Sequence, residues 1–208
     1  MVKVLLLLSG GFDSIVAGHL MLQKDPSLEI VGLHFSQEPF TDDTAEKKCV
    51  QLCKKIGIKQ MLVVTIGEQL ALFTKQCDHR YYYPLQRRFM WRIAEKIAHD
   101  EEASYLLTGE NLGQVSSQTL HHVVANDNAI SMTILRPLLT WIKMDIIALA
   151  EKIGTYSISK GPEFCSVLGP KNPITKARVS QLEYEEKKVD LASMIEEGLQ
   201  TKKTIKFK

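Results

Sequence analysis

Runs of apolar residues alternate along this chain with segments in which apolar residues recur at helical spacing. That alternation is typical of a parallel sheet covered by helices, because the strands of such a sheet are buried on both faces. The pattern predicts strands at 2–8, 29–35, 59–66, 103–108 and 131–135. It predicts helices at 14–24, 43–56, 85–100, 114–124, 141–152 and 175–198. We therefore expect a doubly wound α/β fold with a parallel sheet of about five strands.

The strongest chemical signal follows the first predicted strand, where the sequence reads Ser9-Gly10-Gly11-Phe12-Asp13-Ser14. Two glycines let the backbone approach an anion closely, and the N-terminus of the following helix favours negative charge. The segment lacks the lysine of the GxxxxGK[ST] loop of ATPases and GTPases. It therefore predicts a phosphate site of a different type. An ordinary strand-to-helix turn is the alternative.

Segments with polar residues also lie at the ends of three other predicted strands. His34 and Phe35 end the second strand, the segment 108–119 follows the fourth, and Arg136-Pro137-Leu138 follows the fifth. The carboxyl ends of parallel strands share one edge of the sheet, and ligands of doubly wound sheets bind there. We expect these segments to meet the glycine loop at that edge.

Composition narrows the class of protein. The 208 residues suffice for one domain with a sizeable core, and 45% apolar and 24% charged residues are ordinary for a globular protein. A net charge of +2 does not by itself indicate nucleic-acid binding. No apolar run reaches the roughly 18 residues of a membrane helix, and the first residues do not form a cleavable leader pattern. We expect a cytoplasmic protein without a membrane partner.

Four cysteines, at positions 49, 53, 77 and 165, are too few and too scattered for a disulfide framework. Cys49 and Cys53 are four residues apart in a helical segment, which suits burial better than a metal site without histidine partners. Cys165 lies in a loop rich in glycine and proline, which favours exposure. It is therefore the candidate for a reactive thiol, with a structural role as the alternative.

The sequence resembles the pyrophosphatase-loop (PP-loop) catalytic domain of the ThiI family of tRNA uridine 4-sulfurtransferases. The resemblance covers Val4 to about Asp190, and its motifs are SGGFDS at 9–14, TGENLGQVSSQT at 108–119, Arg136-Pro137-Leu138, Gly154-Thr155 and PEFC at 162–165. It implies that ATP adenylates a uridine carbonyl with release of pyrophosphate, after which a sulfur nucleophile displaces AMP. It also implies a catalytic domain at 1–175, with 176–208 as a C-terminal helix and lysine-rich tail of the same domain.

The resemblance assigns roles to single residues. It implies catalytic roles for Asp13, Lys143 and Cys165, with Asp13 placed to bind Mg²⁺ or its water shell. The residues implied in ATP binding are Leu7, Leu8, Ser9, Gly10, Gly11, Asp13, Ser14, His34, Phe35, Arg87, Gly109 and Gln118. Some have structural alternatives, since Leu7 and Leu8 fit a core strand and His34 fits a buried, hydrogen-bonded histidine.

Arg87 and Lys143, the two cationic side chains in these implied roles, also have structural alternatives. Arg87 lies in the segment 80–92, where four arginines are interspersed with five aromatic residues, a mixture that can bind phosphate and stack on bases. The alternative is an amphipathic helix with Phe89 and Ile93 inward and its arginines in solvent. Lys143 would neutralise charge that develops on pyrophosphate. Without the resemblance it would be an ordinary solvated lysine at a helix start.

The sulfur donor is open at this stage. In enterobacterial members of the family the persulfide cysteine lies in a rhodanese domain, which this chain lacks, and archaeal-type members use a second nearby cysteine. Here Ser166, Val167 and Leu168 follow Cys165. The expected donors are a persulfide carrier or cysteine desulfurase, free sulfide, or one of the remaining cysteines of this chain.

The sequence also leaves open how the RNA substrate is bound. Members of the family begin with ferredoxin-like and THUMP regions that hold tRNA, whereas this chain begins directly before its first predicted strand. We expect tRNA to be the substrate, bound with the help of a separate THUMP-containing protein, and a homodimer is compatible with the resemblance. The lysines of 202–208 either contact phosphates or form a solvated end. The alternatives are adenylation of a small molecule, such as a thiamine precursor or a carboxylate to be amidated, and a non-catalytic adenine-nucleotide-binding module.

Overall fold

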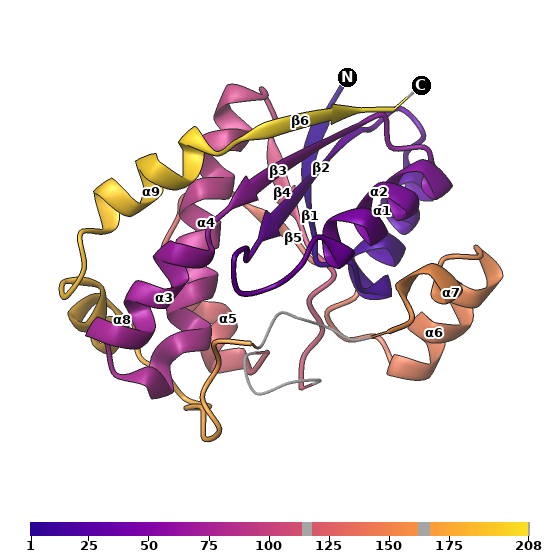
Figure 1. Ribbon diagram of the computed structural model, residues 1–208. Helices are drawn as coiled ribbons and strands as arrows, with labels where there is room; N and C mark the ends of the chain where they lie inside the picture. The colour runs from indigo at the N-terminus through magenta and orange to yellow at the C-terminus, as the bar shows by residue number, and fades with distance from the viewer. Residues whose placement is uncertain (114–117, 162–166, 208) are drawn as a thin grey trace.

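The computed structural model describes residues 1–113, 118–161 and 167–207 and is built around a six-stranded sheet (Figure 1). The strands lie in the order β5-β4-β1-β2-β3-β6. Their bounds are β1 Lys3–Leu8, β2 Glu29–Ser36, β3 Gln60–Thr65, β4 Tyr105–Leu107, β5 Ile134–Leu135 and β6 Lys203–Lys206. Strands β1 to β5 are parallel, and β6 pairs antiparallel with β3.

Helices cover both faces of the sheet (Figure 1). One face carries α1 (Phe12–Lys24), α2 (Thr44–Ile56), α6 (Lys143–Lys152) and α7 (Tyr156–Ser159). The other carries α3 (Gly67–Gln76), α4 (Tyr82–Asp100), α5 (Leu120–Asp127), α8 (Val179–Glu186) and α9 (Leu191–Gln200), with the short 3-10 helix η1 (His79–Tyr81) before α4. Among the helices of the described ranges, none is long and apolar enough to cross a membrane.

The residues of β1 alternate between two hydrophobic cores. Leu5 and Leu7 pack in the cluster on the α4 side, and Val4, Leu6 and Leu8 pack in the cluster with residues of α1 and α2. Each of these five side chains is at most 7% exposed. Side chains of a strand point alternately to opposite faces, so a continuous apolar run is buried along its whole length only when both faces are covered.

The predicted fold class is confirmed, and the structure adds elements that the sequence pattern did not predict, among them α3, α7 and β6. Helix α3 follows β3 directly, and strand β6 lies in the lysine-rich tail. Ile205 and Phe207 pack against the core cluster that contains Met61, while Lys203 and Lys206 are exposed. The tail is therefore an edge strand of the sheet and not a free end.

The predicted long helix at 175–198 is wrong, because two shorter helices occupy that segment. Helix α8 ends at Glu186 and α9 begins at Leu191. Asp190 caps α9, since its Oδ1 accepts a hydrogen bond from the Ser193 N–H at 3.1 Å. Such a cap satisfies a backbone donor at a new helix start. The predicted helix at 114–124 is observed from Leu120, and residues 114–117 lie outside the described part of the chain.

Candidate nucleotide site

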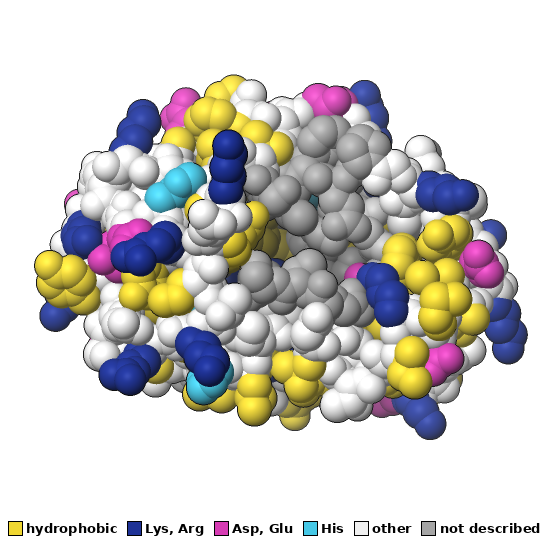
Figure 2. Space-filling view, turned by 90° about the horizontal axis from the view of Figure 1, so that it is seen from below, with side chains coloured by type: hydrophobic (Ala, Val, Ile, Leu, Met, Phe, Trp, Pro, Cys, Tyr) yellow, Lys and Arg dark blue, Asp and Glu magenta, His cyan; other side chains and the backbone are white. Residues whose placement is uncertain are grey.

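The order of the strands reverses between β1 and β4. Strand β1 pairs with β2 on one side and with β4 on the other, and all three are parallel. The loop 9–11 leaves β1 at this point, and the segment 108–111 leaves β4. In doubly wound sheets the ligand crevice lies beyond the carboxyl ends of the strands at such a reversal. Figure 2 views the molecule from below, the side to which the carboxyl ends of the parallel strands point, and the surface is hollowed near its centre.

Two glycines of this region are required by close contacts. Gly10 has a φ of +84°, and a Cβ there would lie 3.3 Å from the carbonyl oxygen of Ala45 in α2. A Cβ on Gly109 would lie 2.4 Å from both the carbonyl carbon of Asp13 and the nitrogen of Ser14. The segment after β4 thus rests directly on the first turn of α1, and no larger residue fits there without displacing that turn.

The loop after β1 is folded by its own hydrogen bonds. The Gly11 N–H donates to Ser9 Oγ at 3.3 Å, and the Ser14 hydroxyl donates to the Gly11 carbonyl at 3.4 Å. Gly11 is the N-cap of α1, so the start of this helix has no side-chain cap. Ser9 is exposed, whereas Ser14 is buried. The loop therefore combines an exposed hydroxyl with the positive end of a helix, which is an arrangement that suits phosphate.

Asp13 and Lys143 meet at this site, although 130 positions separate them in the sequence. Lys143 Nζ lies 3.2 Å from Asp13 Oδ2 and 4.5 Å from the centre of the Phe12 ring. The Lys143 and Asp13 side chains are 44% and 29% exposed. The fold thus brings together two of the residues for which sequence resemblance implies catalytic roles, and it leaves both accessible to a ligand.

Asn111 holds the turn that leads to Lys143. Its side-chain amide donates to the carbonyls of Leu138 and Trp141, both at 2.7 Å, and the residue is only 5% exposed. Sequence reasoning gave Asn111 no role of its own. Its place in the motif at 108–119 was the only sequence signal for a role of this residue. Both of its hydrogen-bond partners lie after β5 and become its neighbours only in the folded chain.

Arg87 faces a buried carboxylate next to the segment after β4. Its Nε lies 3.6 Å from Glu110 Oε1, and its guanidinium carbon lies 5.1 Å from the centre of the Trp91 ring. Glu110 also accepts a hydrogen bond from Arg136 Nε at 2.8 Å. The Arg87 side chain keeps 27% exposure, whereas that of Arg136 keeps 9%. Arg87 is therefore the more accessible of these two cations, and its contact with ATP stays a prediction.

Two other arginines of the segment 80–92 are structural. Phe89 and Ile93 are buried, as the amphipathic alternative predicted, and Arg80 is exposed, but the expectation of solvated arginines is wrong for Arg88 and Arg92. Arg88 is 1% exposed, and Arg88 and Arg92 each donate to Glu186 Oε1 at 2.7 Å. These contacts hold α8 against α4.

His34 is a buried histidine with a backbone partner. Its Nδ1 lies 3.0 Å from the Leu8 carbonyl oxygen, and the residue is 4% exposed. Burial lowers the pKa of His34, which favours the neutral ring. Leu7, Leu8 and Phe35 are buried in the two main cores. These observations favour the structural alternative for the side chains, and the implied contacts of these four residues with ATP stay predictions.

Gln118 carries a buried polar atom that a ligand would satisfy. Its Oε1 has no hydrogen-bond partner among the residues that the structure describes. Its backbone carbonyl accepts a hydrogen bond from the Gly113 N–H at 2.9 Å, so the two ends of the intervening segment are close. A buried acceptor without a partner is costly in a folded protein. Gln118 therefore fits its predicted role as a polar anchor for ATP, which stays untested.

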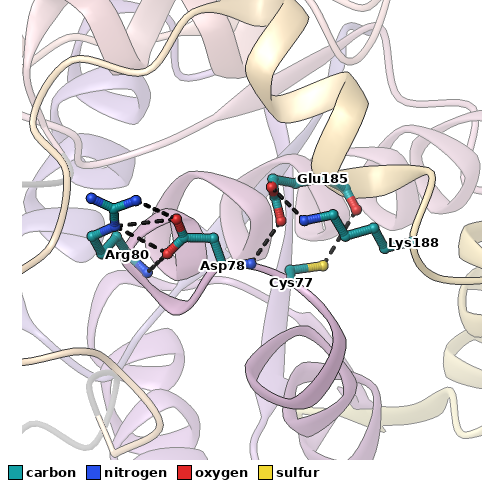
Figure 3. A network of polar contacts seen from close by, with 5 residues as sticks. All are labelled: Cys77, Asp78, Arg80, Glu185 and Lys188. Carbon is teal, nitrogen blue, oxygen red and sulfur yellow. Dashed lines mark hydrogen bonds and ion pairs between the residues drawn. The ribbon is translucent and has the colours of Figure 1, made fainter.

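Three cysteines are buried free thiols. Cys49 and Cys53 are fully buried, which confirms the expectation for this pair, and Cys77 is 9% exposed. Burial raises the pKa of Cys53 to about 12 and that of Cys77 to about 11. Cys77 also donates to the Glu185 carbonyl within a network of polar contacts with Asp78, Arg80 and Lys188 (Figure 3). Neutral thiols are poor nucleophiles, so these cysteines are unsuited to sulfur transfer. Cys165 lies outside the described residues.

The strand order, the glycine loop at its reversal and the paired Asp13 and Lys143 define a doubly wound α/β domain with a candidate phosphate site at that reversal. A family model described as "Thiamine biosynthesis protein (ThiI)" matches residues 1–191, and the chain belongs to this family.

Curated relatives and solved structures agree with that assignment. A probable tRNA sulfurtransferase of Moorella thermoacetica is 37% identical over 202 residues, which cover 94% of this chain and 51% of the relative. One of Brevibacillus brevis is 39% identical and is matched over 95% and 50% of the two chains. This chain thus spans about half the length of these relatives.

The solved structure of a 4-thiouridine synthetase in complex with RNA and bound ATP superposes with a TM-score of 0.92 and 35% identity, covering 99% of this chain and 55% of that one. The NMN synthetase of Francisella tularensis superposes with a TM-score of 0.59 at 15% identity, covering 93% of this chain and 81% of that one, and shares the fold alone.

Proposed function

We propose that this chain is the ATP-using part of a tRNA sulfurtransferase that forms 4-thiouridine. The observation that carries the proposal is the approach of Lys143 to Asp13 beside the glycine loop, at the edge where doubly wound sheets bind nucleotides. The names of the relatives and the RNA and ATP of the similar solved structure support it.

The proposed reaction has two steps. In the first, the uridine carbonyl oxygen bonds to the α-phosphorus of ATP, the bond from that phosphorus to the bridging oxygen breaks, and pyrophosphate leaves. In the second, a sulfur nucleophile adds to the activated carbon, the carbon–oxygen bond breaks, and AMP leaves. Lys143 offsets charge that develops on pyrophosphate, and the loop 9–11 with the start of α1 holds the phosphates.

The Asp13 carboxylate is suited to bind Mg²⁺. Mg²⁺ is commonly held by one or two carboxylates together with substrate phosphates and waters. Among the described residues, no group of three or more histidine, cysteine, aspartate or glutamate side chains could hold a metal by itself. A site completed by ATP phosphates agrees with that donor set. Bound Mg²⁺ would neutralise phosphate charge next to Lys143.

The remaining assignments follow the same proposal. Arg87 and Gln118 anchor polar parts of ATP, because one keeps an accessible guanidinium and the other a buried acceptor without a partner among the described residues. Cys165 accepts the outer sulfur of a persulfide on a carrier or a cysteine desulfurase, whose own thiol leaves, since the three other thiols are buried. That outer sulfur adds to the activated carbon as AMP leaves, and an external thiol then reduces the S–S bond to Cys165 and frees the thiocarbonyl. A THUMP-containing partner assists tRNA binding, and two copies of the catalytic chain act together as a homodimer.

The first test is the release of pyrophosphate from ATP by the purified chain with unmodified tRNA, alone and with a THUMP-containing partner. We expect release that depends on tRNA. Release that depends instead on a small molecule would support the small-molecule alternative. Absence of tRNA-dependent release in both settings would contradict the proposal.

The second test separates the two chemical steps. Cys165→Ala is expected to keep AMP formation and to lose thiolation when sulfur arrives from a persulfide carrier. Cys77→Ala is the matched control, because that thiol is buried and should be dispensable for the chemistry. Full thiolation by the Cys165→Ala variant would make Cys165 a structural residue.

A further inference from the structure

A groove outside the nucleotide site lies between α5 and the start of α8. Its volume is about 330 Å³. Helix α5 lines one side with Leu120, His121, Val124 and Ala125, and residues 177–179 line the other. Leu120 and Val124 are 63% and 62% exposed, which is unusual for large apolar side chains that lie close together.

The charged groups at this groove are basic. Arg178 and His121 line it and are exposed, and exposed Lys176 lies two positions before Arg178. Among the described residues that line the groove, none is acidic. A second groove beside α8, of about 320 Å³, has Asp78, Glu185 and Tyr184 among its lining residues. Two grooves of similar size beside the same helix therefore differ, because one is lined by basic residues and the other by carboxylates that pair with Arg80 and Lys188.

The basic groove is held open by hydrogen bonds. The Thr119 hydroxyl donates to the Thr175 carbonyl at 2.9 Å and accepts from the His122 N–H at 3.2 Å. The N-cap of α5 is thereby tied to the segment that precedes α8. A groove that is already formed loses less entropy on binding than one that must be ordered.

We propose that this groove binds an unpaired nucleotide of the RNA substrate, next to the uridine that is activated. The base lies against Leu120, Val124 and the His121 ring, and neighbouring phosphates lie beside Arg178 and Lys176. Proteins read single-stranded RNA by packing bases on flat or apolar side chains and by pairing phosphates with cations.

The place of the groove in the chain agrees with this role. Leu120 is two residues after Gln118, which we assign to ATP binding, so their α-carbons are at most about 8 Å apart. A nucleotide adjacent to the reacting uridine would thus reach the groove. This inference rests on the proposed function, because it takes RNA as the substrate.

The test uses the whole chain, a fluorescein-labelled unmodified tRNA transcript and fluorescence anisotropy at several salt concentrations. Val124→Glu places a carboxylate in the groove and is expected to weaken tRNA binding about tenfold. That loss corresponds to roughly one contact with a base. Arg178→Ala is expected to reduce the slope of log affinity against log salt by about one. Tyr184→Glu is the matched control, since it places the same carboxylate at an equally exposed position (64%) in the acidic groove.

Unchanged binding by both groove variants, or equal weakening by Tyr184→Glu, would overturn the inference. So would a wild-type dimer in sedimentation that Val124→Glu converts to a monomer, because a second copy of the chain would then cover the groove. Arg178→Ala keeps the test decisive if Val124→Glu does not fold.

Failure of the inference and failure of the proposed function give different results. If the wild-type chain releases pyrophosphate with tRNA but the groove variants bind tRNA normally, only the inference fails. If the groove variants lose tRNA binding but wild type shows no tRNA-dependent release, the proposed function fails and only RNA binding by the groove stands. If wild type binds no tRNA either alone or with the THUMP-containing partner, both fail.

Discussion

Two clusters of opposite charges in this molecule use the same chemistry in different surroundings. At the sheet edge, Lys143 and Asp13 form an ion pair whose side chains are 44% and 29% exposed. Between α4 and α8, Glu186 binds Arg88 and Arg92, and these side chains are only 8%, 2% and 20% exposed. An exposed pair contributes little to stability and can exchange partners, whereas a buried pair cannot lose one member cheaply.

The difference separates residues that serve a ligand from residues that serve the fold. Burial by itself would raise the pKa of Glu186, but hydrogen bonds from Arg88 and Arg92 outweigh it and hold that pKa below its ordinary value. The Glu186 carboxylate is therefore charged, and both of its oxygens accept hydrogen bonds from Arg88 and Arg92. Lys143 and Asp13 lie instead where a nucleotide can reach both, so their arrangement suits chemistry more than stability.

The largest expected effect is on stability at the buried cluster. Glu186→Ala leaves two guanidinium groups without their carboxylate, and we expect the free energy of unfolding to fall by about 3–5 kcal/mol. Urea denaturation measures this free energy of unfolding. Glu196→Ala is the control, because the Lys96–Glu196 pair is 51% and 60% exposed and should contribute less than about 1 kcal/mol. Equal losses in the two variants would erase the distinction between the clusters.

The next effect is on catalysis at the exposed pair. Asp13→Ala should reduce tRNA-dependent pyrophosphate release about 100- to 1,000-fold, the range for loss of one charge-stabilising group in an active site. Its free energy of unfolding should change by less than about 1 kcal/mol, because the pair is exposed. Asp145→Ala is the control, since Asp145 is an exposed carboxylate in the first turn of the same helix as Lys143. Normal turnover by Asp13→Ala would remove this residue from the site.

A smaller effect is expected where the two sides of the strand reversal touch. Gly109→Ala places a Cβ 2.4 Å from the backbone of Asp13 and Ser14, so the first turn of α1 must shift. We expect a loss of about 1–3 kcal/mol in stability, together with reduced pyrophosphate release.

Gly57→Ala is the matched control for that substitution. It has a φ of +82° at the end of α2, and a Cβ there meets no other described atom within 4 Å. It should lose about 1 kcal/mol from backbone strain and keep full activity. Full activity in the Gly109→Ala variant would contradict the role of this contact in positioning Asp13.

The smallest effect is the pH dependence of the buried cluster. The folded-state pKa of Glu186 lies below its ordinary value of 4.5, so the stability that it contributes is present above about pH 4.5 and is lost as the pH falls through the lower folded-state pKa. Urea midpoints measured from about pH 6 downward should fall less steeply in Glu186→Ala than in wild type. Equal slopes would show that the pKa of Glu186 is the same in the folded and the unfolded protein.

Some elements could not be predicted because their signal is not local. Strand β6 reads Lys203-Thr204-Ile205-Lys206, which resembles a polar tail, and only pairing with β3 makes it a strand. The arginines of 80–92 have the composition of a phosphate or base site, yet Arg88 is buried because Glu186, 98 positions later, lies against it. The break between α8 and α9 was visible in principle, since Asp190 and Ser193 form a helix-start pattern.

The sequence by itself determined the five parallel strands, the glycine loop after β1 and the edge at which the site lies. These features depend on short-range properties, namely apolar runs, the conformational freedom of glycine and the direction of parallel strands. Only the tertiary structure decided which charges meet, because Asp13 and Lys143 are 130 positions apart and Asn111 holds a turn that follows another strand. Such contacts depend on how the helices pack on the sheet, which no local pattern specifies.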